Sequence, residues 1–75
     1  MSTTASAFEV NTAREALCAV HDALIHLRAA RDYLTLAGAP RAAARVRAAL
    51  KSAEGAERHA TGRLIRAEHP QGSHR

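Results

Sequence analysis

The sequence predicts an all-α fold: an antiparallel two-helix hairpin that pairs with a second copy into a dimeric four-helix bundle. Three observations support this. Most of the hydrophobic residues are alanine, which favours helix. Large apolar residues recur at steps of three and four, and no alternating strand pattern is present. Gly-Ala-Pro at residues 38–40 separates two long segments. The alternative is three helices, with a break near Gly55.

The first helix is predicted over about residues 8–37, after a disordered N-terminal segment, residues 1–7. We favour this early start because Phe8 and Val10 would otherwise be left in solvent. The chain offers capping boxes for an early and for a later start, each an acceptor with a glutamate three residues on. The two candidates are Ser6 with Glu9, and Thr12 with Glu15.

Apolar residues of the first helix form one stripe, interrupted at Arg31. Further apolar side chains lie off this stripe and would be exposed in a single hairpin: Cys18, Ile25, Ala29 and Leu36. Burying a Leu or Ile side chain contributes about 1.5–3 kcal/mol, so we expect a second copy to cover them. The predicted oligomer or partner interface is Leu17, Val20, Leu24, Ile25, Leu27 and Leu34.

Gly38 suits the left-handed residue after a helix, and Pro40 suits the first turn of the next one. We therefore predict a turn at residues 38–39, a second helix over about 40–68 and a disordered tail, residues 69–75. Residues 8–68 then form a single domain. The inward stripe of the second helix is Ala43, Val46, Leu50, Ala53, Glu57, Ala60, Leu64 and Ala67.

Cysteine usage and hydropathy indicate a cytoplasmic protein. Cys18 is the only cysteine, which a reducing compartment permits. The N-terminus lacks the basic run and apolar core of a signal peptide. No apolar run approaches the roughly 18 residues that a membrane span needs, so no membrane partner is expected.

Positive charge is concentrated in the second half, where residues 38–75 carry eight basic residues against three acidic ones. A basic helix can bind phosphates by releasing counterions. The alternative is a solvated face, which a Glu54–Arg58 pair four residues apart would support. The possible phosphate-binding residues are Arg41, Arg45, Arg47, Lys51 and Arg58.

Site chemistry is sparse in this sequence. Cys18, His21 and Asp22 could approach one metal ion from a helix, but structural zinc sites need three or four ligands, so we predict neither a metal site nor a cofactor. No glycine-rich phosphate loop, nucleophile elbow or zinc-protease motif is present, so no enzyme activity is expected.

These features predict a small, non-enzymatic helical interaction or regulatory protein. We expect it to form a homodimer and to act by binding another protein, because apolar surface on one helix and charge on the other suit protein recognition. The alternative function is a nucleic-acid-binding regulator, for RNA or DNA, that uses the basic face of the second helix.

Overall fold

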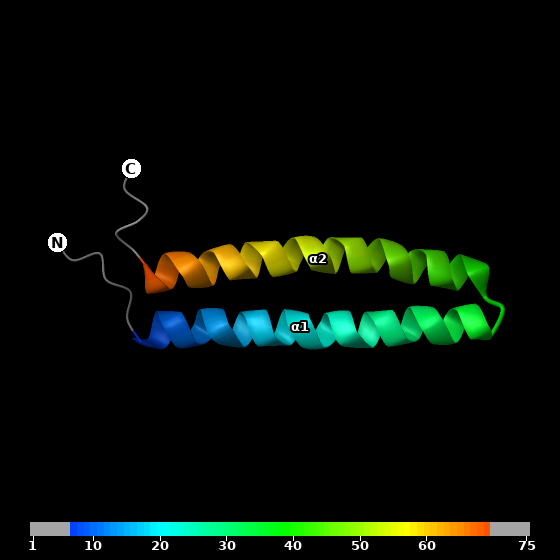
Figure 1. Cartoon of the computed structure of the whole chain (residues 1–75), viewed down its shortest axis with the longest axis horizontal. Helices are drawn as coiled ribbons and strands as arrows, with labels where there is room; N and C mark the ends of the chain where they lie inside the picture. Colours follow the sequence, from blue (N-terminus) through cyan, green and yellow to red (C-terminus); the bar gives the residue numbers. More distant parts are fainter. Residues whose placement is uncertain (1–6, 70–75) are drawn as a thin grey trace.

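A computed structural model describes residues 7–69 of the chain. Within this part, α1 spans Ala7–Leu36 and α2 spans Pro40–Glu68, and the two lie side by side and antiparallel (Figure 1). The predicted all-α hairpin is confirmed. Of the end segments expected to be disordered, residues 1–6 and 70–75 lie outside the described residues, and Ala7 already belongs to α1.

The first helix begins early, as favoured, but the expectation that this start would take Phe8 out of solvent is wrong. Thr12 Oγ1 donates a hydrogen bond of 2.8 Å to the carbonyl oxygen of Phe8, so Thr12 lies inside α1 and does not cap it. Val10 is half-buried, whereas Phe8 remains 77% exposed. The other capping candidate, Ser6, lies outside the described residues.

The reversal between the helices follows from one glycine and one proline. Gly38 has a positive φ of 74°, which glycine adopts without steric penalty. Its N–H donates to the carbonyl oxygen of Thr35 at 3.1 Å, and the N–H of Ala39 donates to that of Leu34 at 2.9 Å. This is a Schellman ending of α1. Pro40, which has no N–H, starts α2 directly afterwards.

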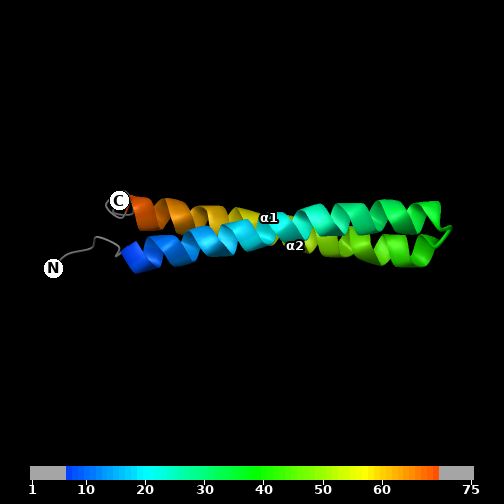
Figure 2. The ribbon, with the colours of Figure 1, turned by 90° about the horizontal axis from the view of Figure 1, so that it is seen from below.

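The core is a narrow seam between the two helices, which cross at a small angle (Figure 2). Every residue of the predicted inward stripe of α2 is buried or half-buried. Only Leu24 and Leu50 are large among the buried residues, at 2% and 6% exposure. The complete buried set in the described part is Ala13, Leu24, Ala43, Leu50 and Ala60.

Helix α2 continues through Gly55 and Gly62 without interruption, so the three-helix alternative is wrong. Neither glycine lies where another backbone approaches, because the nearest atoms to an added Cβ belong to Arg58 and Arg66 side chains. Packing against α1 outweighs the roughly 1 kcal/mol that each helical glycine costs. Neither described helix is long and apolar enough to cross a membrane.

Candidate functional site

Two ion pairs join the helices along one side of the seam. Arg14 Nη2 lies 3.1 Å from Glu68 Oε2, and Arg28 Nη2 lies 3.8 Å from Glu54 Oε2. The arginines are fourteen residues apart on α1, and the glutamates are fourteen apart on α2. Both pairs are therefore satisfied by the same antiparallel register.

His21 and Glu57 form a third contact across the seam. His21 Nε2 lies 2.8 Å from Glu57 Oε2, and Glu57 is the polar member of the inward stripe of α2. With this contact, every glutamate of α2 reaches across to α1. The Glu54–Arg58 pair considered from the sequence does not form, because the Glu54 carboxylate pairs with Arg28.

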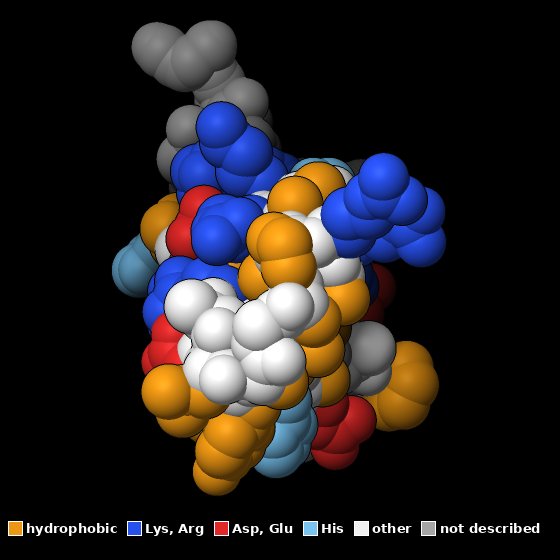
Figure 3. Space-filling model, turned by 90° about the vertical axis from the view of Figure 1, so that its right-hand side faces the viewer, with side chains coloured by type: hydrophobic (Ala, Val, Ile, Leu, Met, Phe, Trp, Pro, Cys, Tyr) orange, Lys and Arg blue, Asp and Glu red, His pale blue; other side chains and the backbone are white. Residues whose placement is uncertain are grey.

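Seven cations lie on the surface of α2, among other exposed residues that include several alanines. All seven are exposed, and none pairs with a carboxylate within residues 7–69. Seen from the turn end of the hairpin, Lys and Arg side chains lie on both sides of α2 (Figure 3). The set contains all five predicted phosphate-binding residues and two more: Arg41, Arg45, Arg47, Lys51, Arg58, Arg63 and Arg66.

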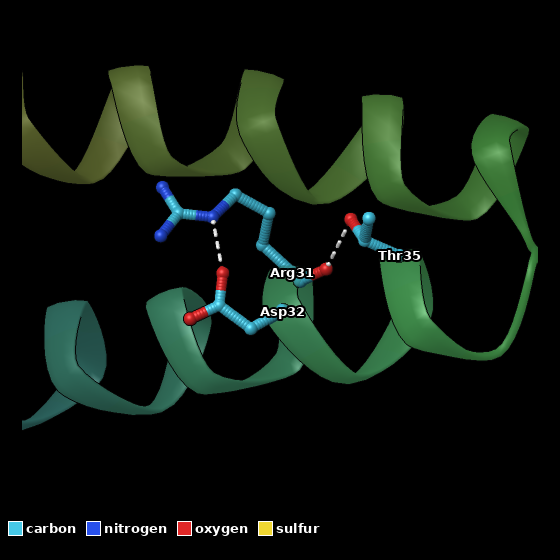
Figure 4. A network of polar contacts seen from close by, with 3 residues as sticks. All are labelled: Arg31, Asp32 and Thr35. Atoms are coloured by element: carbon cyan, nitrogen blue, oxygen red, sulfur yellow. Dashed lines mark hydrogen bonds and ion pairs between the residues drawn. The ribbon is translucent and has the colours of Figure 1, made fainter.

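A shallow groove of about 310 Å³ lies beside the seam near the turn. Arg31, which interrupts the α1 stripe, is half-buried in its wall. Arg31 Nε donates to Asp32 Oδ1 at 3.0 Å, and its carbonyl oxygen accepts a bond of 2.9 Å from Thr35 Oγ1 (Figure 4). Three cations line this groove, Arg31, Arg47 and Lys51. Leu50 and one carboxylate, Glu54, complete its lining.

The side of α1 turned away from α2 exposes apolar residues among polar ones such as Asn11, Glu15 and Asp22, and we call it the outer face of α1. Its large members are Phe8, Ile25, Tyr33 and Leu36, which are 77%, 60%, 71% and 83% exposed. Cys18 and Ala29 are also exposed there. The four off-stripe residues expected to lie in solvent therefore do so: Cys18, Ile25, Ala29 and Leu36.

The predicted interface residues divide between two surfaces. Ile25 belongs to the outer face of α1. Leu24 is buried, and the other four are half-buried in the seam with α2: Leu17, Val20, Leu27 and Leu34. Sequence reasoning did not assign Phe8 and Tyr33 to an interface. Their positions off the three- and four-residue steps of the stripe are the signal that could have indicated this.

The three candidate metal ligands all lie on α1. All three are exposed, and His21 Nε2 also contacts Glu57 Oε2 of α2. Among the residues that the structure describes, no group of three or more His, Cys, Asp and Glu side chains is placed to hold a metal ion.

No family model matches this chain, and it matches none of the curated proteins or solved structures with which it was compared. Two surfaces of the hairpin itself are therefore the candidate sites. These are the outer face of α1 and the cationic surface of α2.

Proposed function

We propose that this chain is a non-enzymatic, self-associating interaction protein that binds other protein chains through the outer face of α1. The observation that carries this proposal is the exposure of Phe8, Ile25, Tyr33 and Leu36 on one helix. Exposed apolar side chains are ordinary when scattered, but a set on one helix face is typical of an interaction site.

Energetics favour a second copy as the first occupant of this face. The seam buries two leucines as its only large side chains within residues 7–69. Small domains of this size are marginally stable without added support. Each large apolar side chain that becomes buried contributes about 1.5–3 kcal/mol, and a symmetric dimer buries every such residue twice.

The proposed dimer contains four helices, with the two α1 helices in central contact and the α2 helices outermost. This arrangement leaves the cations of α2 in solvent, where they are already exposed in a single chain. An amphipathic helix of another protein could use the same face of α1, since helices commonly dock on an apolar helical surface.

Sedimentation velocity of the full chain, across roughly a hundredfold range of concentration, tests the proposal. We expect a dimer that dissociates on dilution. Ile25→Asp should shift the chain to monomer at all these concentrations, because a charged carboxylate would be buried in the contact. Its helical content should persist, because Ile25 lies outside the seam.

Ile65→Asp is the matched control, because Ile65 is a similarly exposed isoleucine, at 54%, located on α2. We expect this variant to remain dimeric. A wild-type chain that is folded and monomeric throughout the range would overturn self-association. If Ile65→Asp dissociated and Ile25→Asp remained dimeric, the contact would lie on α2, and the proposal that it lies on α1 would be wrong.

A further inference from the structure

The outward surface of α2 is positive because its acids are turned away from it. Glu54, Glu57 and Glu68 contact Arg28, His21 and Arg14 of α1. The cations of α2 have no carboxylate partner within residues 7–69. Cross-seam pairing thus divides the charges of α2, leaving acids at the seam and bases in solvent.

These cations lie on both sides of a ridge of small residues. Residues seven apart lie on nearly the same side of a helix, so Ala48, Gly55 and Gly62 form a ridge along the side of α2 opposite its inward stripe. Positions three residues after a ridge residue lie on one side of it, and positions four after or three before lie on the other. The first flank is Lys51 and Arg58, and the second flank is Arg45 and Arg66.

Two arginines lean over the ridge from opposite flanks. Arg58 Nη2 lies 3.7 Å from the point where a Cβ on Gly55 would be, and Arg66 Nη1 lies 3.2 Å from that of Gly62. Without side chains at the glycines, a ligand backbone can approach the helix closely between the two guanidinium groups. Guanidinium groups match phosphate oxygens with paired N–H donors.

We propose that the outer surface of α2 binds duplex DNA in the major groove, with the two flanks contacting phosphates of the two strands. A helix with its side chains is about 10–12 Å across, and the major groove of B-DNA is about 12 Å wide. Alanine and glycine on the ridge offer no side-chain donor or acceptor to base edges. With the flanking Lys and Arg side chains on phosphates, no side chain of the ridge or of its two flanks is left to read base edges. Binding is therefore independent of sequence and driven by counterion release.

Other polyanions fit this surface less well. Single strands are usually held by aromatic stacking, and α2 contains no aromatic residue. Double-stranded RNA has a major groove too narrow for a helix. A membrane-surface helix exposes several large apolar residues beside its cations, whereas α2 exposes one, Ile65. Leu50 is buried, and Val46 and Leu64 are half-buried against α1.

This surface lies on the opposite side of the hairpin from the outer face of α1. DNA binding therefore does not depend on self-association, and a dimer would present two such surfaces. Failure of one proposal leaves the other standing, because their tests alter different helices.

Fluorescence anisotropy of the full chain with a labelled duplex of about 20 base pairs, at salt from about 50 to 200 mM, is the direct test. We expect equal affinity for two unrelated duplex sequences. The logarithm of the binding constant should fall with the logarithm of salt concentration with a slope of about −3 to −4, as four phosphate contacts require. Duplex RNA of matched sequence should bind more weakly.

Two double variants test the flanks separately. Lys51→Gln with Arg58→Gln, and Arg45→Gln with Arg66→Gln, should each weaken binding at least tenfold at low salt and reduce the slope by about 2. The matched control is Ala19→Glu with Ala23→Glu, which lowers the net charge equally at exposed positions of α1 away from its outer face. It should leave the slope unchanged, and circular dichroism should show wild-type helicity in all three variants.

Three results would overturn the proposal. One is the absence of binding to duplex DNA at about 50 mM salt. Another is a salt dependence of the binding constant that is unchanged in either flank variant. The same conclusion would follow if the control variant lost as much of this salt dependence as the flank variants. The last is binding to polyglutamate or to vesicles containing an anionic phospholipid that equals or exceeds binding to duplex DNA, which would identify an acidic protein or a membrane surface as the better partner.

Discussion

Two glycines of this chain, Gly38 and Gly55, differ in backbone conformation and therefore in what an alanine would do there. Gly38 has the left-handed φ of 74° that ends α1, and open space surrounds the position of an added Cβ. Gly55 lies in the interior of α2, where an added Cβ would meet Arg58 Nη2 at an ordinary 3.7 Å. The backbone conformation, rather than crowding, therefore decides the effect of each substitution.

Alanine at these two glycines should change stability in opposite directions. We expect Gly38→Ala to lower the free energy of unfolding by about 1–2 kcal/mol, the cost of a left-handed conformation for a residue with a Cβ. We expect Gly55→Ala to raise it by about 1 kcal/mol through better helix propensity. Urea denaturation followed by circular dichroism measures both, and changes of the same sign would contradict this account.

The two helices have different roles as structural elements. Helix α1 supplies the large seam residue Leu24 and also an exposed apolar face, whereas α2 supplies mostly small seam residues and exposed cations. Ion pairs such as Arg14–Glu68 hold the two helices at one register. These side chains are partly exposed, so each pair contributes only a modest stabilisation.

Exchange of the charges in one cross-seam pair tests that contribution. Arg14→Glu would place two carboxylates together, and we expect the free energy of unfolding to fall by about 0.5–1 kcal/mol at low salt. Adding Glu68→Arg should recover most of the loss, and high salt should shrink both effects because exposed charges are screened. If the double variant lost as much free energy of unfolding as the two single variants together, the two residues would not interact.

As a whole, the hairpin is polarised across its seam, with apolar surface on the outside of α1 and positive charge on the outside of α2. Seen from the turn end, Lys and Arg side chains lie mainly over α2, whereas hydrophobic side chains are seen over both helices (Figure 3). The two proposed contacts therefore lie on opposite sides of the molecule.

Coupling of folding to association should appear in thermal melts of the whole chain. A partner that binds only the folded state stabilises it by mass action, so we expect the melting temperature to rise by several degrees between micromolar and hundred-micromolar protein. Ile25→Asp should remove this dependence, whereas Ile65→Asp should retain it. Circular dichroism at two concentrations is the measurement, and a melting temperature independent of concentration in the wild type would exclude the coupling.

The seam and the reversal of the chain can be predicted from the sequence alone, because both depend on residues close together along the chain. Three- and four-residue apolar steps predict the seam, and Gly38 with Pro40 predicts the reversal, because helix periodicity and helix endings depend on neighbours along the chain. The exposure of some apolar residues of the first helix could also be predicted, since each helix can turn only one side toward its partner.

Tertiary structure decided which groups meet across the seam. Glu54 could pair with Arg58 in its own helix, but the register of the hairpin places Arg28 within reach. The contact between His21 and Glu57 likewise depends on residues far apart in sequence. Sequence periodicity gives the side of a helix on which a residue lies, whereas its partner depends on the axial alignment of the two helices. That alignment therefore determined which basic side chain of α1 each acid of α2 contacts.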